Sequence, residues 1–143
     1  MEQMFNLTAR QRVAVNTGPA NSDLCRSRIC YDHLAGELGV ALYDALVDRG
    51  HIEDRGEETV LTTSGAEFFE GLGANLGQGR SRRPLCRSCL DWSERRNHLA
   101  GRLGQWVLED LLERGWASRD LDSRILRFSD PGLVRFRRRY GLK

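Results

Sequence analysis

Three signals that mark common protein classes are missing from this 143-residue chain. It has no run of 18 apolar residues, which excludes a transmembrane helix. Its first residues, Met1 to Phe5, lack the basic and apolar regions of a secretion signal, so we predict a cytoplasmic protein. Nucleophile-elbow, P-loop and glycine-rich dinucleotide motifs are lacking as well, and a binding role is therefore favoured over an enzymatic one.

Lysine is also scarce, since Lys143 is the sole one, and positive charge comes from arginine. The net charge of +2 is unevenly distributed: residues 1–78 carry −6 and residues 79–143 carry +8. This asymmetry could serve packing between the two halves, pairing of two chains, or a nucleic-acid-binding face. The arginines that could contact phosphates, or form an ordinary solvated surface, are Arg80, Arg82, Arg83, Arg135, Arg137, Arg138 and Arg139.

The chain contains an internal repeat with an offset of 65 positions. Residues 32–39 read Asp-His-Leu-Ala-Gly-Glu-Leu-Gly, and residues 97–104 read Asn-His-Leu-Ala-Gly-Arg-Leu-Gly. The match continues through an Arg-Gly pair that ends at Gly50 in the first copy and at Gly115 in the second. We interpret it as the duplication of one small fold.

Each copy has the pattern of a winged helix. A short amphipathic segment ends in Leu-Gly, where a tight turn is expected, and a second helix follows at 40–49 or 105–114. β-Hairpins are expected at 51–63 and 116–129, each followed by a final helix with a capping residue, Thr63 or Ser64 in one copy and Ser129 in the other. The predicted fold class is mostly α (α+β), with two tandem winged-helix units.

The predicted organisation has four parts. They are an N-terminal arm (1–24), winged-helix repeat 1 (25–76), a linker in which the C-x2-C motif begins (77–88) and winged-helix repeat 2 (89–143). The glycines and arginines between residues 77 and 84 resist packing, which places the boundary there.

The second helix of each copy is poorly suited to reading DNA bases. A helix in the major groove presents basic or amide side chains beside phosphates, whereas these helices carry the acids Asp44, Asp48, Glu109, Asp110 and Glu113. We therefore expect these helices to serve a dimer contact, an interdomain contact or a ligand pocket, and we predict a homodimer.

Four cysteines form two closely spaced pairs. Cys25 and Cys30 are spaced C-x4-C, and Cys86 and Cys89 are spaced C-x2-C. Each pair lies upstream of its own repeat, so the duplication could bring all four thiolates around one zinc ion. Two other interpretations stay open, namely a thiol–disulfide sensor that uses Cys86 and Cys89, and four cysteines that simply pack.

His33 and His98 occupy the same position of the two repeats. This duplicated placement favours a structural role, such as a hydrogen bond at a helix N-terminus, over metal ligation.

The segments 30–40 (Cys-Tyr-Asp-His-Leu-Ala-Gly-Glu-Leu-Gly-Val) and 89–104 resemble the C-terminal region of long ArsR-type helix-turn-helix transcriptional regulators. The resemblance covers residues 25–142 and implies that a DNA-binding winged helix precedes this region. Because 24 residues precede Cys25, we expect a separate C-terminal domain, or DNA contact through the basic half.

The predicted function is that of an effector-sensing or assembly module of a bacterial transcriptional regulator, with a cysteine site that binds zinc or responds to oxidants. One alternative is a nucleic-acid-binding protein whose basic second half contacts phosphates. The other is a protein–protein interaction module whose acidic helices dock on a basic surface.

Overall fold

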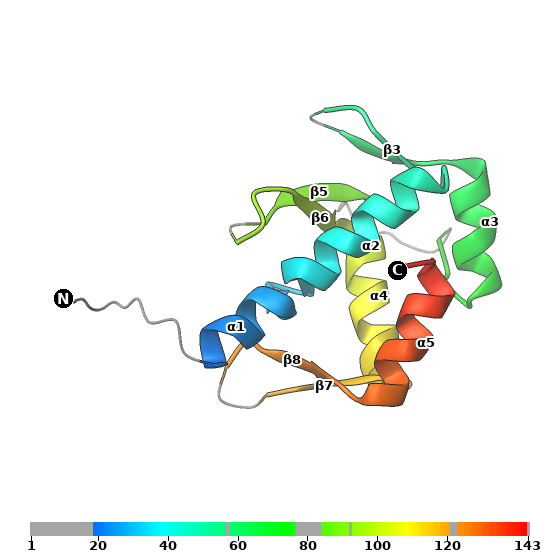
Figure 1. Ribbon diagram of the computed structural model, residues 1–143. Coiled ribbons are helices and arrows are strands. Elements are labelled where there is room, and N and C mark those ends of the chain that lie inside the picture. Colours follow the sequence, from blue (N-terminus) through cyan, green and yellow to red (C-terminus); the bar gives the residue numbers. More distant parts are fainter. Residues whose placement is uncertain (1–18, 57, 77–83, 92, 121–122, 143) are drawn as a thin grey trace.

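The computed structural model describes residues 19–56, 58–76, 84–91, 93–120 and 123–142, which form helices and two-stranded antiparallel hairpins (Figure 1). Helix α1 is Pro19–Arg26. The first half continues with β1 (Arg28–Cys30), β2 (His33–Ala35), α2 (Gly36–Asp48), β3 (Ile52–Asp54), β4 (Thr59–Leu61) and α3 (Thr63–Gly71). The second half contains β5 (Arg87–Leu90), β6 (Asn97–Ala100), α4 (Gly101–Glu113), β7 (Ala117–Arg119), β8 (Leu126–Phe128) and α5 (Asp130–Tyr140).

Both halves follow the order hairpin, helix, hairpin, helix, and the mixed composition agrees with the predicted α+β class. The first part of each half differs from the predicted helix-turn-helix. Gly39 lies inside α2, and the residues before α2 form the β1–β2 hairpin. The conformation that favours glycine occurs at Gly36 (φ +84°), where strand β2 leads into α2. Gly39 serves close packing instead, because a Cβ there would lie 2.6 Å from the carbonyl oxygen of Leu34.

The second hairpin and last helix of each half lie where the sequence predicted them. Each last helix begins with a capped turn: Thr62 Oγ1 accepts a hydrogen bond from the Gly65 N–H, and Ser129 Oγ accepts one from the Gly132 N–H, both at 3.0 Å. The Ser129 cap is as predicted, and the Thr62 cap lies one residue before the predicted position. Side-chain caps of this kind satisfy backbone donors that the first helical turn cannot.

The two halves pack reciprocally. Helix α2 lies on β6 of the other half, α4 lies on β2, and the two helices cross in Figure 1. A Cβ on Gly39 would lie 3.4 Å from the Cβ of His98, and one on Gly104 would lie 3.3 Å from the Cβ of His33. The absence of a side chain at these two glycines therefore lets each helix approach the histidine of the opposite hairpin.

The hydrophobic core draws side chains from both halves. Fully buried members include Leu46 and Phe69 from the first half and Leu111, Phe136 and Tyr140 from the second. Burial of such side chains is worth about 1.5–3 kcal/mol each, so the halves stabilise one another. No helix in the described parts of the chain has the length and apolar character needed to cross a membrane.

Substitution of Gly104 by alanine should lower the free energy of unfolding by about 1–3 kcal/mol, because the new methyl group would lie 2.6 Å from the Leu99 carbonyl oxygen. Gly71→Ala is the matched control, since a Cβ there would meet no described atom within 4 Å. Urea denaturation measures both variants. Equal stability of the two would contradict the packing described for α4.

Candidate metal centre

Two cysteines and two histidines converge where the first hairpins of the two halves meet. Each of Cys30, His33, Cys89 and His98 offers one ligand atom, and these atoms all lie within 4.8 Å of one another. Cys30 lies opposite His33 across the β1–β2 hairpin, and Cys89 lies opposite His98 across the β5–β6 hairpin. Directly opposite residues of an antiparallel pair project from the same face. Each hairpin therefore contributes one thiol and one imidazole.

The two hairpins differ in the length of their loops. The histidines are 65 positions apart in the chain, whereas the paired cysteines are 59 apart. The β5–β6 hairpin thus carries six additional residues between its cysteine and its histidine. These additional residues include Asp91, which reaches back into the centre of the site.

The two imidazole rings face one another. The Nε2 atoms of His33 and His98 are 3.0 Å apart, and the ring centroids are 4.8 Å apart. On its other nitrogen each ring has a carboxylate: His33 Nδ1 lies 3.2 Å from Asp32 Oδ1, and His98 Nδ1 lies 3.0 Å from Asp91 Oδ2. Metal-binding histidines commonly donate their second N–H to a carboxylate in this way.

The carboxylates beside the two Nδ1 atoms determine which nitrogen of each ring carries the proton. If both neutral rings donate Nδ1–H to their carboxylates, both Nε2 atoms carry a lone pair. Two lone pairs at 3.0 Å repel unless a positive charge lies between or beside them. A proton on one Nε2 charges that ring and is donated to the other Nε2, whereas a metal ion could bind both nitrogens and also the two sulfur atoms beside them. The donor arrangement is therefore well suited to a cation.

Asp91 is a fully buried carboxylate that connects this site to the first half. Its Oδ1 accepts hydrogen bonds from Arg28 Nη2 at 2.9 Å and Ser93 Oγ at 2.7 Å, and its Oδ2 accepts one from the Gly36 N–H at 2.6 Å. Burial alone would raise the pKa of Asp91, but the hydrogen bonds from Gly36, Ser93 and Arg28 hold that pKa well below its usual range. Asp91 is thus an ionised anchor for His98 and for the start of α2.

Burial also sets the protonation of the other groups. Desolvation, followed by the neighbouring His33, lowers the pKa of His98 to about 4, although Asp91 acts in the opposite direction. Desolvation, followed by the neighbouring Cys30, raises the pKa of the Cys89 thiol to about 11. The imidazole is therefore neutral at pH 7, as metal binding requires, and the thiol would release its proton on binding a metal ion.

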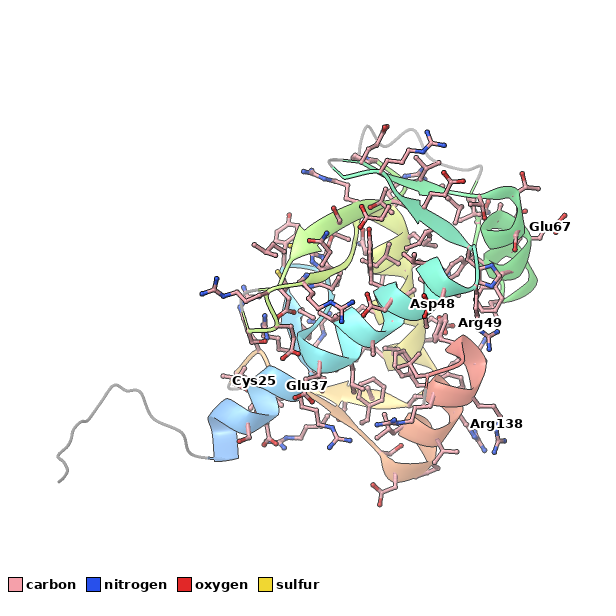
Figure 2. The ribbon with its side chains drawn as sticks, turned by 45° about the horizontal axis from the view of Figure 1, so that its top comes forward. Cys25, Glu37, Asp48, Arg49, Glu67 and Arg138 are labelled. Carbon is pink, nitrogen blue, oxygen red and sulfur yellow. The ribbon has the colours of Figure 1, made fainter. Side chains whose placement is uncertain are left out.

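The structure brings together two of the four cysteines predicted as ligands. Cys25 lies on α1 (Figure 2), and Cys86 is a buried residue whose thiol pKa is raised to about 12 by burial. Neither belongs to the group of four ligand atoms found among the described residues. The other two members of this group are His33 and His98, for which the sequence favoured a structural role. The short Cys30-x2-His33 spacing is the signal that could have indicated them.

The arginines predicted to contact phosphates are only partly described. Arg80, Arg82 and Arg83 lie outside the described residues. The others lie on α5, where Arg135 and Arg138 are exposed. Figure 2 labels Arg138 on this helix. Arg139 is engaged within the fold, because its Nη1 contacts Asp110 Oδ2 at 2.6 Å and its guanidinium stacks over Trp116.

The chain has a relative among known proteins. It is 37% identical over 145 residues to a Bacillus subtilis (strain 168) protein named as an uncharacterized HTH-type transcriptional regulator, YdfF. The match includes the whole of this chain and 64% of the relative, so the chain spans somewhat less than two thirds of that protein. No family model matches the chain, and no solved structure matches it. The chain is thus similar along its full length to a transcriptional regulator of the helix-turn-helix type.

Replacing Asp91 by asparagine should destabilise the metal-free protein by about 3–5 kcal/mol, because it removes the buried negative charge that pairs with Arg28. Asp32→Asn is the matched control. It also removes a carboxylate from a histidine, but this carboxylate is 21% exposed, and we expect a cost of less than about 1 kcal/mol.

Chemical denaturation in the presence of a chelator measures the free energy of unfolding of both variants. Ser93→Ala removes one hydrogen bond to the Asp91 carboxylate and should lower the free energy of unfolding by about 1.5–3 kcal/mol. This variant serves as the test if Asp91→Asn does not fold. Similar small costs for Asp91→Asn and Asp32→Asn would contradict the anchoring role.

Proposed function

We propose that this chain is the effector-sensing or assembly module of an ArsR-type transcriptional regulator, and that its effector is a zinc ion bound by Cys30, His33, Cys89 and His98. The observation that carries the proposal is the convergence of these four donors within 4.8 Å. The relationship to a protein named as a transcriptional regulator supports the regulatory part. A role in binding rather than in catalysis, in the cytoplasm, follows from this proposal.

The donor set favours zinc over other common ions. Two thiolates and two imidazoles form a frequent tetrahedral zinc set, with Zn–S distances of about 2.3 Å and Zn–N distances of about 2.0–2.1 Å. Magnesium and calcium prefer oxygen ligands. In a tetrahedron of this size the ligand atoms lie about 3.3–3.8 Å apart. Only small side-chain movements are needed, because the four atoms already lie within 4.8 Å.

The site would couple binding to the arrangement of the two halves. One thiol and one imidazole come from each of two hairpins, so a bound ion would link β1–β2 to β5–β6. Strands β2 and β6 of these hairpins pack directly against α2 and α4. A ligand that binds one arrangement of such elements more tightly shifts the population toward it. We propose that this shift is what a DNA-binding partner or a second copy of the chain would sense.

Zinc content and thermal stability test this function. Protein purified without chelator should contain one zinc per chain, and its melting temperature should fall when the metal is removed. At free zinc about 1,000-fold above Kd the stabilisation should reach about 4 kcal/mol.

His98→Ala should weaken zinc affinity by more than about 100-fold, since loss even of groups that only support a ligand costs 10–100-fold. A Cys25→Ala variant is the control and should bind as the parent does, because Cys25 is not part of the described ligand group. Mass spectrometry for metal content and a competition titration measure these effects. Zinc binding that depends on Cys25 and not on His98 would refute the assignment.

A second candidate function is phosphate contact through the basic second half. The observation that favours it is the exposure of Arg135 and Arg138 on α5. If this face binds DNA, the double variant Arg135→Ala/Arg138→Ala should weaken binding and reduce the slope of log K against log salt by about 1.8 for two phosphates. Gel shifts over a salt series measure this, and the absence of binding at low salt would remove the candidate.

A further inference from the structure

Two of the four cysteines are placed to react with one another. The sulfur atoms of Cys30 and Cys89 lie within 4.8 Å of one another, on two different hairpins that contact each other through β2 and β6. Both residues are half-buried, so small molecules can reach them from solvent. Cys86, by contrast, is buried and has no place in this group. The geometry thus pairs Cys89 with Cys30, and not with the Cys86 that precedes it in the C-x2-C motif.

The distance between the sulfur atoms suits a disulfide. A disulfide requires an S–S separation of about 2.05 Å, so the two sulfur atoms must approach by less than about 3 Å. Cys30 is the last residue of β1, and Cys89 lies next to the last residue of β5. Both residues therefore lie beside hairpin loops, where a side-chain rotation and a small backbone shift can supply this approach.

We propose that Cys30 and Cys89 form a reversible disulfide when no metal ion holds their thiolates, so that the same site responds to oxidants of the peroxide class as well as to metal. The competition with metal rests on the proposed function, whereas the disulfide itself does not. The site would then have two mutually exclusive states. Oxidation removes both thiolates, which leaves His33 and His98 as the only donors of the set and abolishes tight zinc binding.

The reaction balances with hydrogen peroxide as the oxidant. One thiol loses its proton, and its sulfur attacks a peroxide oxygen; the O–O bond breaks, and a sulfenic acid and one water molecule form. The second thiol then attacks the sulfenic sulfur, which expels a second water molecule and forms the S–S bond. Two electrons pass from the two sulfur atoms to the peroxide. A dithiol reductant reverses the bond by exchange through a mixed disulfide.

Peptide mapping of the metal-free protein tests the disulfide directly. After treatment with hydrogen peroxide, non-reducing mass spectrometry should show the Cys30 peptide linked to the Cys89 peptide. The number of free thiols should fall from four to two and return to four with a dithiol. The double variant Cys25→Ala/Cys86→Ala should form the same link, and Cys30→Ser should not. A Cys86–Cys89 link, or four thiols that stay free or oxidise singly, would overturn the proposal.

A second arm treats the zinc-loaded protein in the same way. Bound zinc should slow formation of the link at least tenfold, and the link, once formed, should prevent zinc uptake. Equal rates with and without zinc would overturn the competition. A chain that forms the Cys30–Cys89 link but binds no zinc refutes the proposed function and not the disulfide. A chain that binds zinc but never forms the link refutes the disulfide alone.

Discussion

The close approach of each long helix to the hairpin of the opposite half is the constraint on which the rest of the structure depends. Helix α2 packs on β6 and helix α4 packs on β2, with Gly39 and Gly104 giving room to the opposing histidines. This reciprocal packing brings the two hairpins into contact through β2 and β6. Because each hairpin carries a cysteine opposite a histidine, the meeting creates a site with two equivalent halves that neither hairpin contains alone.

The site combines that symmetry with one asymmetric element. The six additional residues of the second hairpin place Asp91 between Arg28, His98 and the first turn of α2. The protein loses stability if a buried carboxylate keeps only some of its hydrogen-bond donors. The same residue therefore orients one proposed ligand and fixes the entry of a core helix. Through it, a change at the metal centre would reach the packing of the two halves.

Local signals in the sequence were sufficient for part of the fold. Turn and cap chemistry located the hairpins around residues 51–63 and 116–129 and the Ser129 cap, and Gly50 takes the positive φ expected after a helix. The segment that ends at Gly39 was predicted as the first helix of a helix-turn-helix, but its residues 33–35 form strand β2. A strand of three residues that runs straight into a helix carries too short a pattern to separate the two periods. Of the four residues of the candidate site, Cys30 and Cys89 were among those predicted from the sequence as possible ligands. Alignment of the repeat by its histidines puts the cysteines out of register, and this concealed the pairing of Cys89 with His98, which are nine positions apart in the sequence and opposite one another in the folded hairpin.

X-ray absorption spectroscopy of the zinc-loaded protein tests most directly whether two sulfur and two nitrogen atoms hold one zinc ion between the hairpins. We predict two sulfur neighbours at about 2.3 Å and two nitrogen neighbours at about 2.0–2.1 Å, with the multiple scattering of imidazole rings. A shell of four sulfur atoms, or one of oxygen atoms without imidazole scattering, would contradict the account.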